Sequence, residues 1–368
     1  MSERDDAKHW LTENRIEDVE AFVPDMAGAA RGKVIPADKF TEQSMKMPEA
    51  VFAQTISGEY IDDDTNQEDR DMILVPDYDT LRPVPWAVDT AASVFLDCLR
   101  LDGEPVPKSP RQILRQVMAL YEEQGWQPIV APEVEFYLIK SHTDADEEVE
   151  PPEGRLGRTD LSRQPYSIDT MNDFEPFIMD VYKFCEAQGI RIDTLSQEMG
   201  PAQFEINFLH GDPIDLADQV FLFKRTVREA AIRHEMHATF LAKPMADEPG
   251  SALHIHQSVI RTEDGSNVFS TGDGEASDLF YAFLGGLQVY LPEAMLILAP
   301  YVNSYRRFQS YSAAPVWFAI ESLEASEAMR RTLGEAFVRL YCNLKKAEYA
   351  EFQHVITPWE RELLLLNV

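Results

Sequence analysis

The chain has 368 residues, of which 45% are hydrophobic and 26% are charged, and these values are typical of a folded globular protein with a sizeable core. Its 64 acidic and 33 basic side chains give a formal net charge of −31, which excludes a surface suited to nucleic acid or anionic lipid. No run of 18 apolar residues occurs and residues 1–15 are polar, so we expect neither a membrane span nor a signal peptide.

Cysteine usage and surface charge bear on where the protein works. The three cysteines, Cys98, Cys185 and Cys342, are far apart and show neither a zinc-binding spacing nor a disulfide framework, so we expect reduced thiols and a cytoplasmic location. The acidic surface fits a halophilic or salt-adapted source as well as it fits an ordinary acidic protein, and the sequence leaves both interpretations open.

The first predicted unit covers residues 1–103. It mixes short apolar runs with turns and closes with a strand-like segment at residues 92–101. A helix then begins where Ser109 can cap it and Pro110 fits its first turn, and Gly125 ends it. The sequence therefore predicts a domain boundary near residue 103, with a second domain over residues 104–368.

Helices are predicted at several places in this second unit. Residues 173–188 form one and residues 212–235 another, in which apolar side chains recur at helical spacing. After Trp317 the chain reads as helical almost to its end.

Three strand-like segments between these helices alternate apolar and polar residues. Each segment alone fits a half-exposed sheet with one solvated side. Together they place carboxylates, amides and imidazoles on one face without a cation, and crowded carboxylates repel one another unless a positive charge neutralises them. The polar positions are Glu133 and Glu135 in residues 131–139, Gln203, Glu205 and Asn207 in residues 201–209, and His254 and His256 in residues 251–259.

This face has the ligand chemistry of a divalent metal site. Carboxylate oxygens with an imidazole suit Mg²⁺ or Mn²⁺, and such ions hold ATP phosphates during phosphoryl transfer. A metal hydrolase built on His254 and His256 is a weaker interpretation, since only His354 follows them and too few imidazoles remain to complete such a centre.

Five motifs, in order, resemble those of the glutamine synthetase superfamily. Their order and spacing match from about residue 20 to residue 317, and again in the closing helices. The third motif carries Ala202 where the family usually has glycine. The motifs are RGKVIP at residues 31–36, PEVEF at 132–136, QEMGPAQFE at 197–205, the segment 238–258 with its H-x-H triplet, and YVNSYRRF at 301–308.

The resemblance implies an α+β fold. A small N-terminal β-grasp-like domain would precede a large catalytic domain built on a curved antiparallel sheet flanked by helices. Family members form stacked rings whose active sites are shared between neighbouring subunits, so we expect a large ring-shaped homo-oligomer. The apolar closing segment at residues 362–368 would then be buried against another subunit.

The resemblance also assigns roles to the polar residues. Glu135, Glu198 and Glu205 would hold one metal. Glu133 and His254 would hold a second metal that bridges the ATP phosphates.

Four further residues receive roles by the same resemblance. His256 and Ser258 would lie beside the ATP. Gly250 would let the backbone approach the substrate. Arg307 would bind the glutamate carboxylate or the phosphoryl group in transfer, which makes it the expected catalytic residue.

The implied reaction joins an amine to the γ-carboxylate of glutamate. ATP phosphorylates the carboxylate to γ-glutamyl phosphate, and the amine then displaces phosphate. The expected partners are glutamate, ATP and a small amine. Residues 52–60 lack the aspartate of ammonia-using members, and residues 75–86 and 165–175 look more like the γ-glutamylpolyamine synthetase branch, which uses putrescine or a related amine. Ammonia is the alternative acceptor.

One stretch typical of the family is missing after Trp317. The family continues with W-G-x-x-N-R, a further arginine and a third glutamate for the second metal, whereas this chain passes to residues 319–337, which resemble the final helices. Glu321, Glu324 and Glu327 have the spacing of a solvated helix face. The catalytic domain is therefore predicted to be truncated near residues 317/318. The alternative function is a catalytically impaired or non-catalytic member that still binds nucleotide and metal.

Overall fold

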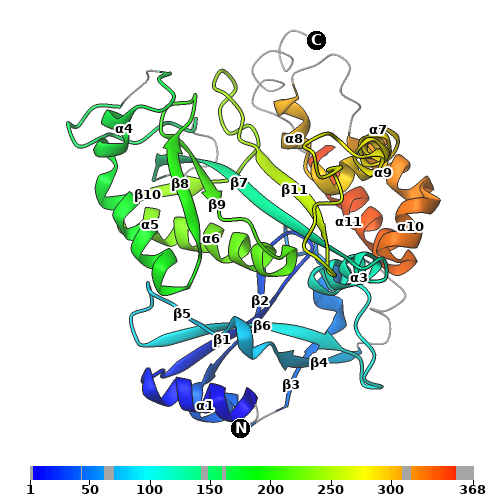
Figure 1. The fold of residues 1–368 in the computed structure, drawn as a ribbon. Coiled ribbons are helices and arrows are strands. Elements are labelled where there is room, and N and C mark those ends of the chain that lie inside the picture. Colours follow the sequence, from blue (N-terminus) through cyan, green and yellow to red (C-terminus); the bar gives the residue numbers. More distant parts are fainter. Residues whose placement is uncertain are drawn as a thin grey trace.

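The structure is a computed structural model in which two β-sheets are linked by helices (Figure 1). It describes residues 3–42, 44–61, 70–141, 148–159, 163–308 and 316–353, so the closing segment 362–368 lies outside the described residues. The first sheet comes from residues 18–99 and the second from residues 126–261. The predicted boundary at residue 103 falls between them. The division into two domains and the β-grasp character of the first stay predictions.

The N-terminal sheet is mixed. Its strands lie in the order β2-β1-β6-β4-β3, with β5 beside β6. Strands β1 and β6 run parallel, and the other described pairs are antiparallel. The elements here are α1 (Glu3–Glu13), β1 (Asp18–Pro24), β2 (Ala30–Pro36), α2 (Ala37–Phe40), β3 (Met45–Pro48), η1 (Glu49–Ala53), β4 (Asp71–Pro76), η3 (Tyr78–Thr80), β5 (Arg82–Pro83) and β6 (Ala91–Leu99).

The second sheet is antiparallel throughout, as the resemblance implies. Its order is β10-β7-β9-β8, and β11 also pairs with β7. Because β10 and β11 both pair with β7, the chain leaves the sheet after Thr239 and rejoins it at Leu253. The strands are β7 (Trp126–Lys140), β8 (Ile192–Gln197), β9 (Gln203–Phe208), β10 (Met236–Thr239) and β11 (Leu253–Arg261).

Two long helices cover the apolar face of this sheet (Figure 1). They are α5 (Glu175–Ala187), which follows the short α4 (Ile168–Asp173), and α6 (Pro213–Arg233), and both lie where the sequence predicts them. Phe136, Phe204 and Ile206 of the sheet point into this layer and are fully buried. Burial of large apolar side chains supplies the main stabilisation of such a layer.

Helix α3 (Pro110–Glu122) joins the two sheets, and its predicted start is only partly confirmed. Pro110 occupies the first turn, and Gly125 adopts φ +69° just beyond the helix, as a stop signal requires. Ser109, however, makes no side-chain capping hydrogen bond. Its side chain is buried instead.

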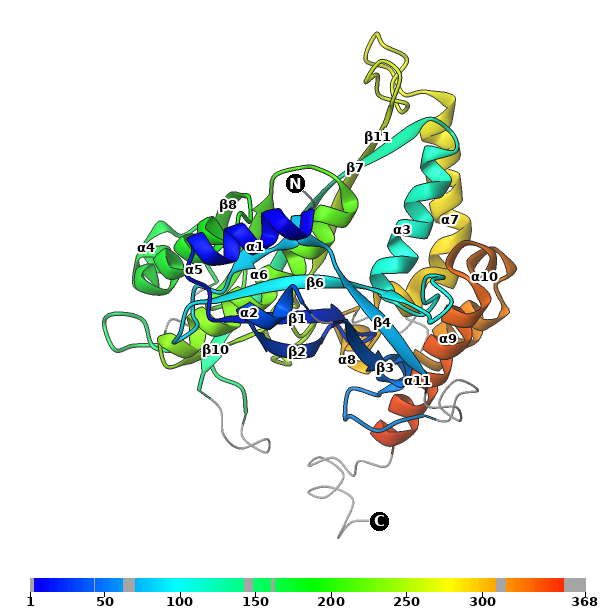
Figure 2. The same ribbon diagram turned by 90° about the horizontal axis from the view of Figure 1, so that it is seen from below.

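The closing region is helical, as predicted, and forms a third apolar cluster with α3 and α7 (Figure 2). Glu321, Glu324 and Glu327 are exposed on these helices, as their spacing predicts. The helices of this region are α7 (Asp278–Leu298), α8 (Val302–Arg307), α9 (Val316–Ala325), α10 (Glu327–Leu333) and α11 (Glu335–Gln353).

Helix α7 is unusually exposed for an apolar helix. It is long and apolar enough to cross a bilayer by length and composition, although the sequence contains no run of 18 apolar residues. Within its most apolar 18-residue stretch, 6% of the residues are buried. Leu296 is fully buried against α9, whereas Tyr281, Val289 and Leu298 are 63%, 61% and 59% exposed. In the described part of the chain, most of the surface of α7 therefore lacks a packing partner.

Candidate metal and substrate site

Strand register brings the predicted polar positions into one surface. His254 of β11 lies opposite Glu133 of β7, and Glu133 lies opposite Asn207 of β9. Glu135 lies opposite Glu205 in the next row. Directly paired residues project from the same face of a sheet. The polar faces that the sequence predicts separately are therefore continuous.

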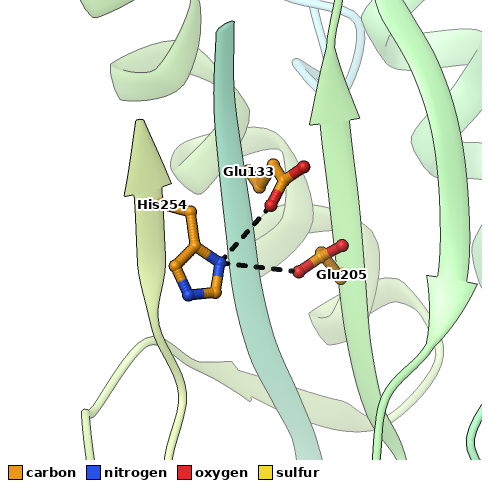
Figure 3. Close-up of side chains that lie close together, drawn as sticks. All are labelled: Glu133, Glu205 and His254. Atoms are coloured by element: carbon orange, nitrogen blue, oxygen red, sulfur yellow. Dashed lines mark ion pairs between the residues drawn. The ribbon is translucent and has the colours of Figure 1, made fainter. Parts of the chain in front are cut away.

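The imidazole of His254 points toward two of these carboxylates, those of Glu133 and Glu205 (Figure 3). Its Nδ1 atom is 3.4 Å from Oε2 of Glu133 and 4.0 Å from Oε2 of Glu205. One ligand atom from each of the three residues lies within 4.8 Å of the others. Two carboxylate oxygens and an imidazole nitrogen form a donor set that suits Mg²⁺ or Mn²⁺.

This compact group differs from the two ligand sets that the resemblance implies. Glu205 belongs to one set, and Glu133 and His254 belong to the other. Glu135 is close by, with Oε1 4.0 Å from Nδ1 of His254. Glu198 lies in the turn between β8 and β9, outside the compact group. All five predicted ligands therefore lie on or beside one face.

The carboxylates of this face are poorly neutralised. Burial raises the pKa of Glu135, Glu198 and Glu205, because desolvation disfavours the charged form, and neighbouring carboxylates raise each pKa further. The amide of Ala252 opposes the shift at Glu135. Among the described residues, no lysine or arginine forms an ion pair with these three groups. A bound divalent cation would supply the missing positive charge, so the residues present fit such an ion.

The two residues assigned to ATP lie further along β11. Nε2 of His256 is 2.9 Å from Oε1 of Glu133, and the His256 side chain is 67% exposed. Ser258 is half-buried on the same strand. His256, which is predicted to lie beside the ATP, therefore contacts a predicted metal ligand directly.

The two predicted substrate-binding residues, Gly250 and Arg307, pack against each other. A β-carbon on Gly250 would lie 2.6 Å from Cγ of Arg307 and 2.5 Å from the carbonyl oxygen of Ala242, so only glycine fits at this position. Nε of Arg307 is buried and has no hydrogen-bond partner among the described residues. An unsatisfied buried donor costs free energy, and an anionic ligand would satisfy it.

Gly250 belongs to the loop of residues 242–252, which forms most of the connection between β10 and β11. The amide of Lys243 donates to Oδ1 of Asn303 (2.8 Å), and Nδ2 of Asn303 donates back to the Lys243 carbonyl oxygen (2.9 Å). Asn303 precedes Arg307 on α8, within the motif at residues 301–308. The loop and the helix that carries Arg307 are thus fastened together.

Three residues to which the sequence assigned no role are part of the framework of the site, although Gln203 was among the predicted polar positions. Asn303 holds the loop, and the hydroxyl of Tyr137 donates to the carbonyl oxygen of Pro249 (2.7 Å). Gln203 donates to Oε2 of Glu135 (3.1 Å). Strand alternation could have indicated Tyr137, because it places this residue on the same face as Glu133 and Glu135. The structure shows in addition that Tyr137 is fully buried.

The sequence family follows from comparison with known proteins. The model described as "Glutamine synthetase, catalytic domain" matches residues 107–320 and 318–364. The chain belongs to the glutamine synthetase family. The match falls into two segments that meet at residues 318–320, next to Trp317.

Similar proteins include ligases with different acceptors. The chain is 36% identical to γ-glutamylputrescine synthetase PuuA of Escherichia coli over 299 residues, which cover 79% of this chain and 63% of PuuA. It is 30% identical to a glutamate–isopropylamine ligase of a Pseudomonas species, over 82% of this chain and 67% of that protein. A glutamine synthetase of Halobacterium salinarum is 29% identical, over 90% and 73% of the two chains. The matched region thus spans less than two thirds of PuuA.

Solved structures support the fold. GmaS without ligand aligns with a TM-score of 0.80 and 23% identity, covering 98% of this chain and 99% of that chain. A GmaS/ADP complex aligns with the same TM-score and 22% identity, with the same coverage. The glutamine synthetase fold implied by the sequence motifs is therefore present.

The family departure at Ala202 has a visible backbone consequence. Ala202 adopts φ +53°, in the left-handed region that favours glycine. This conformation costs an alanine roughly 1–2 kcal/mol. The Ala202 side chain is buried in the core beside α5 and α6, and this burial offsets part of the cost.

Proposed function

We propose that the chain is an ATP-dependent ligase that joins an amine to the γ-carboxylate of glutamate, with Mg²⁺ or Mn²⁺ bound at the carboxylate face. The observation that carries this proposal is the compact group of Glu133, Glu205 and His254 on three adjoining strands, beside a glycine loop packed on Arg307. The resemblance to PuuA and to the isopropylamine ligase supports glutamate as one substrate.

The proposed metal ligands are those that the resemblance implies. Glu135, Glu198 and Glu205 would hold one ion, and Glu133 and His254 would hold another. Bound divalent cations would neutralise charge on the ATP phosphates. The solved GmaS/ADP complex has the same fold and supports nucleotide use.

The residues of the chain would act by binding and orientation. The loop at Gly250 and the guanidinium of Arg307 would hold glutamate, while His256 and Ser258 would contact ATP. A γ-carboxylate oxygen attacks the γ-phosphorus, the bond to ADP breaks, and γ-glutamyl phosphate forms. The amine nitrogen then attacks the acyl carbon, phosphate leaves, and the nitrogen loses a proton. Arg307 would stabilise the charge on the moving phosphoryl group.

We propose putrescine or a related amine as acceptor, with ammonia as the alternative. The segment at residues 52–60 lacks the aspartate that ammonia-using relatives carry. The described part of this loop contacts α11, where the amide of Ile56 donates to Glu348 (3.0 Å) and the hydroxyl of Ser57 donates to Glu351 (2.8 Å). The net charge of −31 favours a cationic acceptor.

An internal gap after Trp317 supports the alternative of an impaired enzyme. Trp317 and Phe318, on either side of the proposed break, are 44% and 49% exposed. Most of α7 is also uncovered by the residues that the structure describes. The segment that relatives carry here would cover this surface and would supply arginines and a third ligand for the second metal. Ligation would then be slower than in an intact relative by about 10³-fold or more, since one such arginine is worth this much.

The test is amide formation by the chain as it stands. The protein is incubated with ATP, Mn²⁺, glutamate and, separately, putrescine, isopropylamine or ammonia, and the amide is measured by mass spectrometry with PuuA as positive control. We expect slow product with putrescine and at least tenfold recovery when the PuuA segment is inserted between Trp317 and Phe318. The ligase proposal is refuted if neither the chain as it stands nor the variant with the inserted segment forms product with any of the amines. If the chain without the insertion works as fast as PuuA, the gap after Trp317 does not impair catalysis.

Assembly and location stay proposals. We propose a ring-shaped homo-oligomer and a cytoplasmic location. Light scattering tests the first, because a monomeric mass in solution contradicts a ring.

A further inference from the structure

The side chain of Gln203 joins the carboxylate face to the glycine loop. Gln203 begins β9 and is 1% exposed. Its Nε2 donates to Oε2 of Glu135 (3.1 Å) and to the carbonyl oxygen of Gly250 (3.2 Å), and Oγ of Ser251 is 3.4 Å away. One amide group therefore contacts both a proposed metal ligand and the residue that must remain glycine.

The other end of this amide is fixed. Oε1 of Gln203 accepts a hydrogen bond from the amide of Gly200 (2.9 Å). A β-carbon on Gly200 would lie 2.8 Å from this oxygen and 1.9 Å from the hydroxyl oxygen of Tyr137, so the backbone approaches closely because residue 200 is glycine. An amide flip would lose this bond. The donor end of Gln203 is therefore directed at Glu135 and the loop.

The orientation of the Glu135 carboxylate depends on the same loop. Oε2 of Glu135 also accepts from the amide of Ala252 (3.0 Å), and the amide of Glu135 donates to the Ala252 carbonyl oxygen (3.1 Å). Oε2 is thus held by two donors, while Oε1 faces His254. A displacement of residues 250–252 would rotate the carboxylate that a metal would bind.

The rest of the loop is fastened elsewhere. Asn303 holds Lys243, the hydroxyl of Tyr137 holds the carbonyl oxygen of Pro249, and the amide of Ser251 donates to the carbonyl oxygen of Ala242 (2.9 Å). None of these contacts involves a carboxylate of the polar face. The contacts of Gln203 and Ala252 thus form the described link between Glu135 and the loop.

We propose that Gln203 is a positioning residue that couples metal occupancy at the carboxylate face to the order of the 242–252 loop. A metal that fixes Glu135 would fix the donor shared with Gly250, and an ordered loop would in turn hold Glu135 in the orientation that binds metal. Such coupling is reciprocal by thermodynamic linkage. The metal half of this inference rests on the proposed function. It predicts that bound metal orders the loop proposed to receive glutamate, and that an ordered loop strengthens metal binding.

Two variants and the wild-type protein test the coupling. Gln203→Met keeps the length of the side chain and removes its donors. Gln197→Met is the matched control, because Gln197 is also 1% exposed, lies on the neighbouring strand β8, and has no side-chain hydrogen-bond partner among the described residues. Mn²⁺ affinity is measured by titration calorimetry. Hydrogen exchange of the amides of Glu248 and residues 250–252 is measured without metal and at saturating Mn²⁺.

Wild type and Gln197→Met should bind Mn²⁺ alike and gain protection in the loop when Mn²⁺ binds. Gln203→Met should bind about tenfold more weakly, as expected when a partner of a metal ligand is lost. It should also show no gain in loop protection at saturating Mn²⁺. A residue with only a structural role would lower protection in both states and leave the gain intact, and that result overturns the proposal.

The metal-free measurement separates this inference from the proposed function. If wild type binds no Mn²⁺, the metal half of the proposed function and the coupling to metal both fall. Hydrogen exchange without metal then tests whether Gln203 holds the loop in place. Faster exchange at amides 250–252 in Gln203→Met than in Gln197→Met supports that link, and equal exchange removes it.

Discussion

Arg307 packs directly on Gly250, with room for hydrogen but not for a methyl group between them. An added β-carbon would be 2.6 Å from Cγ of Arg307. The charge of Arg307 also lowers the pKa of Glu135, which burial raises. The loop backbone, the arginine and the carboxylate face are therefore parts of one packed unit.

Gly250→Ala should destabilise the protein by about 1–3 kcal/mol, because overpacking forces Arg307 or the Ala242 backbone to move. Gly285→Ala is the matched control. A β-carbon on Gly285, in α7, meets no atom within 4 Å. This second change should stabilise by about 0.5–1 kcal/mol through helix propensity. Urea unfolding of both variants measures the difference. Equal effects would show that Gly250 is not tightly packed.

Mn²⁺ affinity should depend on the carboxylates around His254. Glu205→Gln and Glu133→Gln should each weaken binding by about tenfold or more, a loss of about 1.4 kcal/mol. Glu321→Gln on the exposed side of α9 should leave the affinity unchanged. Calorimetric titration gives the constants. The metal site is abandoned if Glu135→Ala combined with Glu205→Ala binds Mn²⁺ as wild type does.

Arg111→Met should destabilise the protein by about 3–5 kcal/mol, the cost of leaving buried charges without their partner. The Arg111 side chain is 4% exposed and contacts Asp77 (2.6 Å), Asp97 (2.7 Å) and Asp218 (2.8 Å), which links the N-terminal sheet to α6. Arg155→Met removes an exposed ion pair with Asp173 and should change stability by less than about 1 kcal/mol. Chemical denaturation compares the two. Similar small losses would mean that Arg111 is not a buried link.

Lys224 should make stability depend on alkaline pH. Burial, with a contribution from Arg228, lowers the pKa of Lys224 to about 8. The unfolded chain therefore binds this proton more strongly between about pH 8 and pH 10.4, and folding becomes more favourable as pH rises through that window. Below pH 8 the buried charge destabilises the fold.

Lys224→Met should therefore stabilise the protein by about 1–3 kcal/mol at pH 7 and by progressively less up to about pH 10.4. Lys183→Met, at an exposed position of α5, is the control and should show no such trend. Unfolding free energies at several pH values provide the measurement. A constant difference between Lys224→Met and wild type across the window would contradict the lowered pKa.

Salt should stabilise the fold. At a net charge of −31, carboxylates repel one another at low ionic strength, and salt screens this repulsion. The melting temperature should rise between low and molar KCl, as scanning calorimetry can measure. A flat or falling melting temperature would argue against adaptation to salt.

Local pattern was sufficient for several features of this protein. Alternation placed Glu133 and Glu135 on the same face of one strand, because side chains alternate at every residue of an extended chain. Helical periodicity located α5 and α6 in the same way. The family motifs identified the glutamine synthetase fold, which the family match and the solved structures confirm.

Other features depended on how distant segments pack. Register between β7, β9 and β11 placed Glu205, rather than Glu198, within reach of both Glu133 and His254. Sequence does not reveal register between strands that lie tens of residues apart, because turns and core packing set it together. The contact between Gly250 and Arg307 and the double role of Gln203 likewise depend on a loop folded back on the sheet, so only the tertiary structure decided them.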